Sequence, residues 1–138
     1  MEQAVFESIE YSAGCQDCGA GLKCWGVQAL VNGSLRWDTE SRCPACGFAV
    51  AACGGDLPAE LRDRLLSEHG PPRLRVDASA SNTVIMRVLR AELGIGLAEV
   101  KAVLSEVLTG AFSGTMPEME FLARRLRVSG IVAVAARP

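Results

Sequence analysis

Two short cysteine motifs constrain this chain more than any other feature of its sequence. Residues 15–19 and 43–47 each follow the pattern Cys-x-x-Cys-Gly. A Cys-x-x-Cys turn presents two sulfur atoms to one ion, and zinc prefers a tetrahedral set of four thiolates. Glycine after the second cysteine allows the positive φ that such a tight turn often requires. The spacing therefore predicts a structural Zn²⁺ site with the ligands Cys15, Cys18, Cys43 and Cys46.

The 24 residues between Cys18 and Cys43 have the pattern of a β-hairpin. Residues 27–31 and 35–38 are strand-like, and they flank Asn32-Gly33. Asn-Gly between two apolar runs is a strong signal for a type I′ turn. A hairpin with a cysteine motif at each end is the arrangement of a zinc ribbon.

Disulfides and a redox motif are the alternatives to zinc. The acidic residues Glu2 and Glu7 stand where a secretory signal would be basic, so we expect a cytoplasmic protein in which disulfides are rare. A thioredoxin-like motif needs one Cys-x-x-Cys at the start of a helix, whereas here two motifs precede strand-like sequence. Both alternatives are weaker than zinc.

Cys24 and Cys53 follow the two motifs at similar distances. The simplest interpretation is that each is a small buried side chain on the strand after its motif. Two alternatives are that one of them replaces a metal ligand, or that the two form an oxidation-sensitive pair.

The charge of the cysteine-containing half argues against two roles for it. Residues 1–72 carry ten acidic and five basic side chains, a net charge of −5, whereas residues 73–138 carry six and nine, a net charge of +3. An acidic ribbon is poorly suited to bind nucleic acid. Four cysteine ligands also leave no open position on zinc for catalysis.

Three segments follow from this division: a zinc ribbon over 1–55, a short helix and Gly-Pro-Pro linker over 56–72, and an α/β domain over 73–138. Asp56 is the expected N-cap of the short helix, which continues to about Glu68. The leucines at 57, 61, 65 and 66 form one stripe, which we expect to pack on one of the two domains. The single histidine, His69, is interpreted as a helix-end residue.

The last segment has a mixed α+β pattern. Strand-like sequence at 73–78 is followed by two helical patterns. The first is capped by Ser79 or Ser81 and continues to about Glu92, and the second covers 97–108. A short strand is expected near 110–114, then a helix from Pro117 and a final strand at 131–135, which makes the order βααβαβ. The expected inner side chains are Val84, Ile85, Val88, Leu89, Leu93, Leu97, Val100, Val103, Leu104, Val107, Met119, Leu122, Ala123 and Leu126.

Residues 84–90 and 93–101 resemble the C-terminal domain of the bacterial ribosomal stalk protein. The resemblance consists of a basic pair on the first helix, the turn Leu-Gly-Ile-Gly-Leu at 93–97, and a lysine on the second helix. Gly130, followed by a β-branched strand, also fits. The resemblance covers residues 73–138 and implies the same βααβαβ fold.

In that family the domain recruits translational GTPase factors through its first two helices. The resemblance therefore implies a partner-binding face in which Arg87, Arg90 and Lys101 are the basic contacts, beside the apolar residues Val84 and Ile95. The alternative is that the two arginines form the solvated side of an amphipathic helix. An acidic ribbon replaces the dimerisation region and long hinge of the ribosomal protein, so this chain is not that protein.

An enzyme is the weakest functional class for this sequence. No nucleophile motif or phosphate-binding loop is present, and Gly94-Ile95-Gly96 lacks the remaining dinucleotide signature. We expect a non-catalytic adaptor whose partner is a translation factor, the ribosome or another acidic protein, with no membrane span and no small-molecule substrate. An immunity protein that neutralises a toxin and a nucleic-acid-binding regulator are the two alternatives.

Overall fold

The computed structural model describes residues 3–138, so Met1 and Glu2 lie outside the described part. The chain divides into two compact units, Met1–His69 and Gly70–Pro138. We call them unit 1 and unit 2. Unit 1 is a β-sheet with one helix, and unit 2 is mostly helical, so the fold is of the mixed α+β kind that the sequence predicts.

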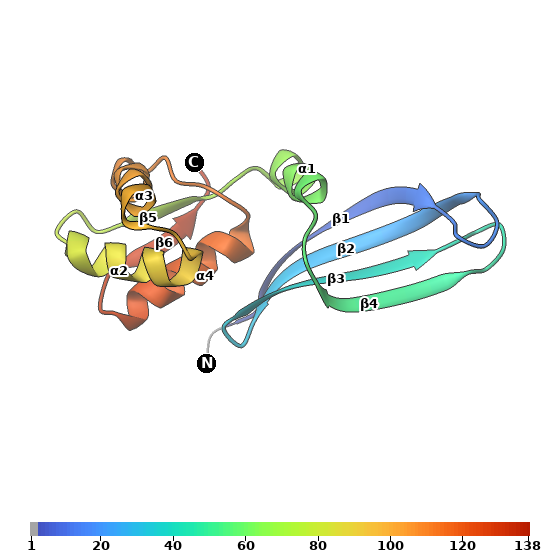
Figure 1. Ribbon diagram of the computed structural model, residues 1–138, viewed down its shortest axis with the longest axis horizontal. Helices are drawn as coiled ribbons and strands as arrows, with labels where there is room; N and C mark the ends of the chain where they lie inside the picture. The colour runs from blue at the N-terminus through green and yellow to red at the C-terminus, as the bar shows by residue number, and fades with distance from the viewer. Residues whose placement is uncertain (1–2) are drawn as a thin grey trace. The chain divides into compact units, whose positions relative to one another are not determined.

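Unit 1 is built on a four-stranded antiparallel sheet with the order β1-β2-β3-β4 (Figure 1). Each strand pairs with the next one in the sequence, so every connection within the sheet is a hairpin. The strands are β1 (Val5–Gly14), β2 (Gly21–Val31), β3 (Ser34–Arg42) and β4 (Ala49–Gly55).

The predicted Asn-Gly hairpin is confirmed. It joins β2 to β3, with Asn32 at φ 51° and Gly33 at φ 78°, as a type I′ turn requires. Both strands are longer than predicted, because their pairing continues as far as Lys23 and Arg42. The sequence predicts a ribbon of two strands, whereas the sheet has four. The cysteine motifs are the turns of two further hairpins, β1–β2 and β3–β4.

Helix α1 (Ala59–His69) belongs to unit 1 and packs on β1. Its side chain Leu65 is fully buried and lies in one cluster with Ile9 and Trp37. The predicted N-cap, Asp56, is wrong. Pro58 is the residue whose carbonyl accepts the first helical hydrogen bonds, from the N–H groups of Leu61 and Arg62.

Unit 2 contains three helices and a two-stranded antiparallel sheet; its second and third helices contact the sheet, and its first helix packs on those two helices. Ser81 caps the first helix by accepting a hydrogen bond from the N–H of Val84, and Gly94 ends that helix at φ 64°. Thr115 and Glu118 form a capping box at the start of the third helix. The elements are β5 (Arg73–Val76), α2 (Asn82–Leu93), α3 (Leu97–Thr109), α4 (Met116–Val128) and β6 (Ala133–Ala136).

The strand expected near 110–114 does not form. Only an isolated bridge between Arg73 and Ser113 marks its place, so the observed order is βαααβ and not βααβαβ. Gly110 ends α3 in the left-handed conformation, and the capping box at Thr115 then begins α4. Too few residues remain between these two helix boundaries for a regular strand.

The core of unit 2 contains most of the side chains that helical periodicity predicts. Leu97 is a correction: it begins α3 and is 52% exposed. Val84, Val103 and Leu104 are half-buried and pack against the edge of the core. The fully buried members are Leu74, Ile85, Val88, Leu89, Val100, Val107, Met119, Leu122, Ala123, Leu126, Ile131 and Ala133.

Candidate metal centre

The pairing of the two central strands brings the cysteine motifs together. The first motif lies between β1 and β2, and the second lies between β3 and β4. Lys23 near the start of β2 pairs with Arg42 at the end of β3. Two turns that are 24 residues apart in the sequence therefore emerge side by side at the same end of the sheet.

The two motifs have the same backbone geometry. In the first, the N–H of Cys15 donates to the carbonyl of Ala20 at 2.8 Å, and that of Gly19 donates to the carbonyl of Cys15 at 3.0 Å. The equivalent hydrogen bonds of the second motif run from Cys43 to Phe48 at 2.7 Å and from Gly47 to Cys43 at 2.9 Å. The two glycines have φ values of 76° and 80°, which a side chain would strain.

The four sulfur atoms form one cluster. All of them lie within 4.8 Å of one another, with Cys15 Sγ 3.7 Å from Cys46 Sγ and Cys18 Sγ 3.5 Å from Cys43 Sγ. Sulfurs bound to one zinc at ~2.3 Å in a tetrahedron are about 3.8 Å apart. The cluster therefore has the composition and dimensions to hold one metal ion, and zinc fits it. The predicted set of four cysteines is the set that the fold brings together.

The electrostatics of the cluster also favour a cation. The backbone N–H of Cys46, helped by that of Ala45, lowers the pKa of the Cys43 thiol from 9.0 to about 7. The N–H of Phe48 lowers the pKa of Cys46, but burial and the neighbouring cysteines outweigh it and raise that pKa to about 12. The N–H of Ala20 lowers the pKa of Cys18, yet the adjacent Cys43 contributes to a net rise. Because neighbouring thiolates disfavour one another, a divalent cation would stabilise all four in their charged form.

One side of the cluster is shielded and the other is open. Cys15 and Cys43 are buried, whereas Cys18 and Cys46 are exposed. The buried pair packs with Leu22 and with the partly buried Tyr11, Ala20 and Phe48. The metal site is thus part of the core at this end of unit 1.

Within residues 3–138, the metal-binding cluster does not include Cys24 or Cys53. Cys24 is buried on β2, as predicted, and its sulfur accepts a hydrogen bond from Ser41 Oγ at 3.3 Å. The same prediction is wrong for Cys53, which is exposed on β4. Among the described elements only β3 contacts β4, so no element covers either face of this strand at Cys53.

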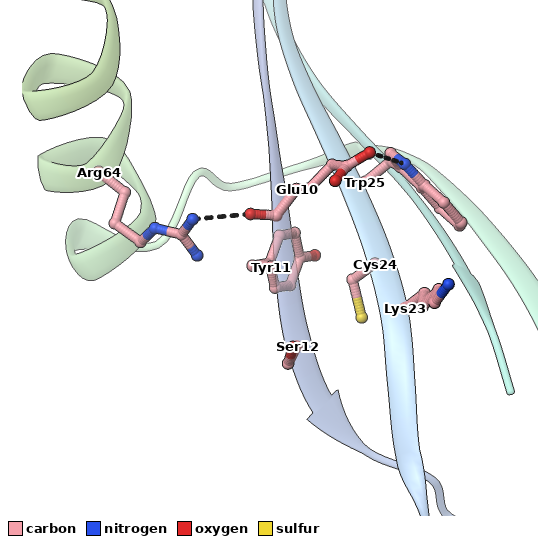
Figure 2. Close-up of a pocket in the computed structure, with 7 residues that line it drawn as sticks. All are labelled: Glu10, Tyr11, Ser12, Lys23, Cys24, Trp25 and Arg64. Carbon is pink, nitrogen blue, oxygen red and sulfur yellow. Dashed lines mark hydrogen bonds between the residues drawn. The ribbon is translucent and has the colours of Figure 1, made fainter.

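Unit 1 also contains a pocket of about 620 Å³ that was not predicted (Figure 2). Trp25 Nε1 donates to Glu10 Oε1 at 3.0 Å, and Arg64 Nη2 donates to the backbone carbonyl of Glu10 at 2.7 Å. Burial raises the pKa of Tyr11, with a further contribution from Cys24. These contacts join β1 to β2 and α1. The lining residues are Glu10, Tyr11, Ser12, Lys23, Cys24, Trp25 and Arg64.

The face of unit 2 that the stalk-protein resemblance implies contains an open groove of about 740 Å³. Of the five residues expected there, Arg87, Arg90 and Ile95 line it. Val84 is half-buried against the core, and Lys101 is exposed on α3 outside the lining. The other residues that line the groove were not predicted from the resemblance. The lining residues are Thr83, Met86, Arg87, Arg90, Ala91, Gly94, Ile95 and Leu97.

His69 ends α1 and points back to β1. Its Nε2 lies 2.8 Å from the carbonyl of Ser8 and so donates a hydrogen bond to it. Its Nδ1 lies 4.0 Å from Oε2 of the buried Glu7. The histidine therefore attaches the helix to the sheet.

Compared with known protein families, with curated proteins and with solved structures, the chain matches none of them. Within residues 3–138, every helix is too short or too polar to cross a membrane.

Proposed function

We propose that this protein is a non-catalytic adaptor. Unit 1 is a zinc ribbon whose Zn²⁺ has a structural role, and the groove along α2 and the turn into α3 of unit 2 recruits a protein partner. The observation that carries the partner-binding role is the groove itself, in which two arginines stand beside exposed apolar surface.

The tetrahedral dimensions of the four-sulfur cluster support zinc as its metal. Replacement of Cys43 by Ser should remove the ion and destabilise the ribbon, because metal binding contributes much of the folding free energy of such a small site. Metal content by mass spectrometry tests this. Cys24→Ser and Cys53→Ser are matched controls that should retain one zinc per chain. A Cys43→Ser variant with undiminished zinc would contradict the ligand set.

The charges around the groove support an acidic partner. Arg87 and Arg90 form no ion pair with the residues that the structure describes, whereas Arg124 and Arg127 on α4 both pair with Glu120. Unpaired arginines beside a partly apolar groove can form charge-assisted hydrogen bonds to carboxylates while the partner covers the apolar part. Met86, Ile95 and Leu97 provide that apolar part.

The resemblance of residues 73–138 to the ribosomal stalk domain suggests a translational GTPase factor as the partner. The absence of any family match leaves the resemblance as the only source of that suggestion. The missing third strand is a further difference from the family's fold. Neither difference affects α2 and the turn that leads into α3, which line the groove.

Two features support a role without catalysis. Four thiolate ligands complete the coordination of zinc and leave no position for a substrate or a reactive water. His69, the only histidine, is hydrogen-bonded to the sheet at Ser8 and is not among the residues of either large pocket.

A binding titration with purified bacterial translational GTPase factors tests the proposal. Replacing Arg87, Arg90 and Lys101 together by Glu should weaken binding at least about 100-fold, because each favourable charge contact becomes a repulsive one. The double variant Arg73→Glu/Arg75→Glu is a control, since these exposed arginines on β5 lie outside the groove.

The outcomes separate the two parts of the proposal. If no factor binds the wild-type protein, the translational partner is wrong. If a factor binds the wild-type protein and the triple Glu variant equally well, the groove is wrong. Thermal unfolding of each variant checks that the substitutions leave unit 2 folded.

A further inference from the structure

The two edge strands of the sheet in unit 1 differ in how far another element covers them. At the β1 edge, Arg64 and His69 of α1 donate hydrogen bonds to the carbonyls of Glu10 and Ser8, at 2.7 and 2.8 Å (Figure 2 shows the first). These two carbonyls belong to residues i and i+2 of the strand, so both point to the same edge of the sheet. Helix α1 therefore covers this edge and occupies part of its backbone hydrogen-bonding capacity, which is a common protection against edge-to-edge pairing.

The β4 edge has no such protection. All seven residues of β4 are exposed, and none is charged or a proline. Within residues 3–138, β4 pairs only with β3 and makes no substantial contact with any other element. Natural proteins usually protect a free edge with a charge, a proline, a bulge or a covering segment.

The one irregularity of β4 lies at its far end. The pairing with β3 shifts between Trp37 and Thr39, where the N–H of Gly54 donates to Asp38 Oδ1 at 2.8 Å. Residues 49–52 remain in regular register with β3. An uncharged segment in regular register is therefore available for pairing along its outer side.

We propose that β4 pairs antiparallel with β4 of a second copy of this chain, which joins two four-stranded sheets into one. The two-fold axis passes through Ala51, so that Ala51 faces its equivalent and Ala49 faces Cys53. An antiparallel pair of identical strands is self-complementary, which is the requirement of a closed dimer. This inference concerns unit 1 and is independent of the groove in unit 2.

The side chains of β4 favour a second copy over a foreign peptide. In strand addition, the backbone supplies affinity and pockets for side chains supply specificity. The five residues from 49 to 53 are three alanines, a valine and a cysteine, so they form no deep pockets. An equally small and uncharged strand matches them, and β4 itself has that composition.

The charges nearest to the two-fold axis permit this pairing. Glu40 pairs with Ala51, so the dimer places the two copies of Glu40 three strand spacings apart. That separation is about 14 Å, beyond the screening length of about 8 Å at physiological salt. Arg42, which pairs with Ala49, lies at a similar remove from the second copy, so no charge on β3 opposes the pairing.

The dimer should be weak and reversible. Pairing over five residues buries less than the roughly 1,000 Å² of a strong interface. We therefore expect a concentration-dependent equilibrium, which sedimentation equilibrium of the zinc-loaded full chain measures between about 5 and about 500 µM. The wild-type protein should shift from monomer to dimer over this range.

Charge substitution at the axis tests the geometry. Ala51→Lys and Ala51→Glu each place like charges directly opposite one another, so each variant alone should remain monomeric. An equimolar mixture of the two should form a dimer again, because Lys then faces Glu. Ala13→Lys, a change of the same kind at an exposed site on β1, is the control and should dimerise as the wild type does.

Three results would overturn the proposal: a wild-type protein that is monomeric at every concentration, dimers that persist in both Ala51 variants, or a mixture that stays monomeric. Zinc content and tryptophan fluorescence of each variant establish that unit 1 is folded. Because both tryptophans lie in unit 1, this fluorescence reports on that unit alone.

Discussion

The indole ring of Trp37 lies directly over Gly26, with the ring atoms occupying the space that a Cβ at position 26 would need. Trp37 on β3 pairs with Gln28, so the ring reaches diagonally across β2. Ile9 and Leu65 pack around it in the same buried cluster. A glycine in the middle of a strand is usually a weakness, but here it makes room for the largest side chain of the core.

Gly26→Ala should destabilise unit 1 by about 3 kcal/mol, because the added methyl group must displace a buried indole. Urea unfolding of the zinc-loaded protein, followed by tryptophan fluorescence, measures the change. Gly21→Ala on the same strand is the control: no atom lies within 4 Å of its Cβ position, and its stability should change by less than about 0.5 kcal/mol. Equal effects of the two substitutions would show that the ring does not restrict position 26.

Leu65→Ala should weaken the attachment of α1 to the sheet. Leu65 is fully buried against Ile9 and Trp37, and truncation of such a leucine costs about 2–5 kcal/mol. The same fluorescence-detected unfolding gives the magnitude. Ser67→Ala, on the exposed side of the helix, is the control. A Leu65→Ala protein as stable as the wild type would mean that α1 does not contribute to the core of unit 1.

Removal of zinc should affect the two units differently. The cluster lies in the turns of the sheet in unit 1, whereas the core of unit 2 contains no metal ligand among its buried residues. A strong chelator should therefore change tryptophan fluorescence and leave most of the helical circular-dichroism signal, which comes mainly from α2, α3 and α4. Simultaneous loss of both signals would indicate that the two units unfold as one.

Acid should destabilise the metal-free form of unit 1 near neutral pH. The folded-state pKa of Cys43, about 7, lies below its usual 9.0, so the charged thiolate favours the folded state. This contribution is fully present above pH 9 and is lost as the pH falls through 7. A titration of ultraviolet thiolate absorbance should show one step near pH 7 that is absent from Cys43→Ser.

The pKa of Cys46 is shifted in the opposite direction, so its effect on stability should depend on pH in the opposite way. Its pKa is raised to about 12, so its contribution is present below pH 9 and is lost as the pH rises through 12. Zinc should remove both effects, since all four thiolates then stay ionised to lower pH. A single thiolate step at the usual pKa in the metal-free protein would contradict the opposed shifts.

The metal ligands could be predicted because their signal is local and chemical. Five consecutive residues specify a Cys-x-x-Cys-Gly turn, and Gly19 and Gly47 have the positive φ values that the sequence predicts. The same is true of the helices in unit 2: Ser81 is one of the two N-caps that the sequence offers for α2, Gly94 ends that helix as predicted, and the buried stripes follow the helical period. The capping box at Thr115 was not predicted.

Strand β1 and the exposure of individual side chains were harder to predict. The buried face of β1 includes Glu7, a charged residue that interrupts the alternation of polar and apolar side chains. Cys53 and Leu97 are apolar residues in favourable patterns, yet both are exposed because no neighbouring element covers them. Periodicity shows which face of an element is apolar, but it does not show whether another element packs there.

The sequence alone determined the four cysteines of the candidate metal cluster, the Asn32-Gly33 turn and the approximate extents of the helices in unit 2, since each depends on residues close together in the chain. Only the tertiary structure decided that the cysteine motifs end two hairpins of one sheet, that α1 covers the β1 edge, and that β4 stays open. These features depend on pairing between distant segments. Short-range patterns do not encode that pairing, because each strand is compatible with more than one neighbour until the whole sheet forms.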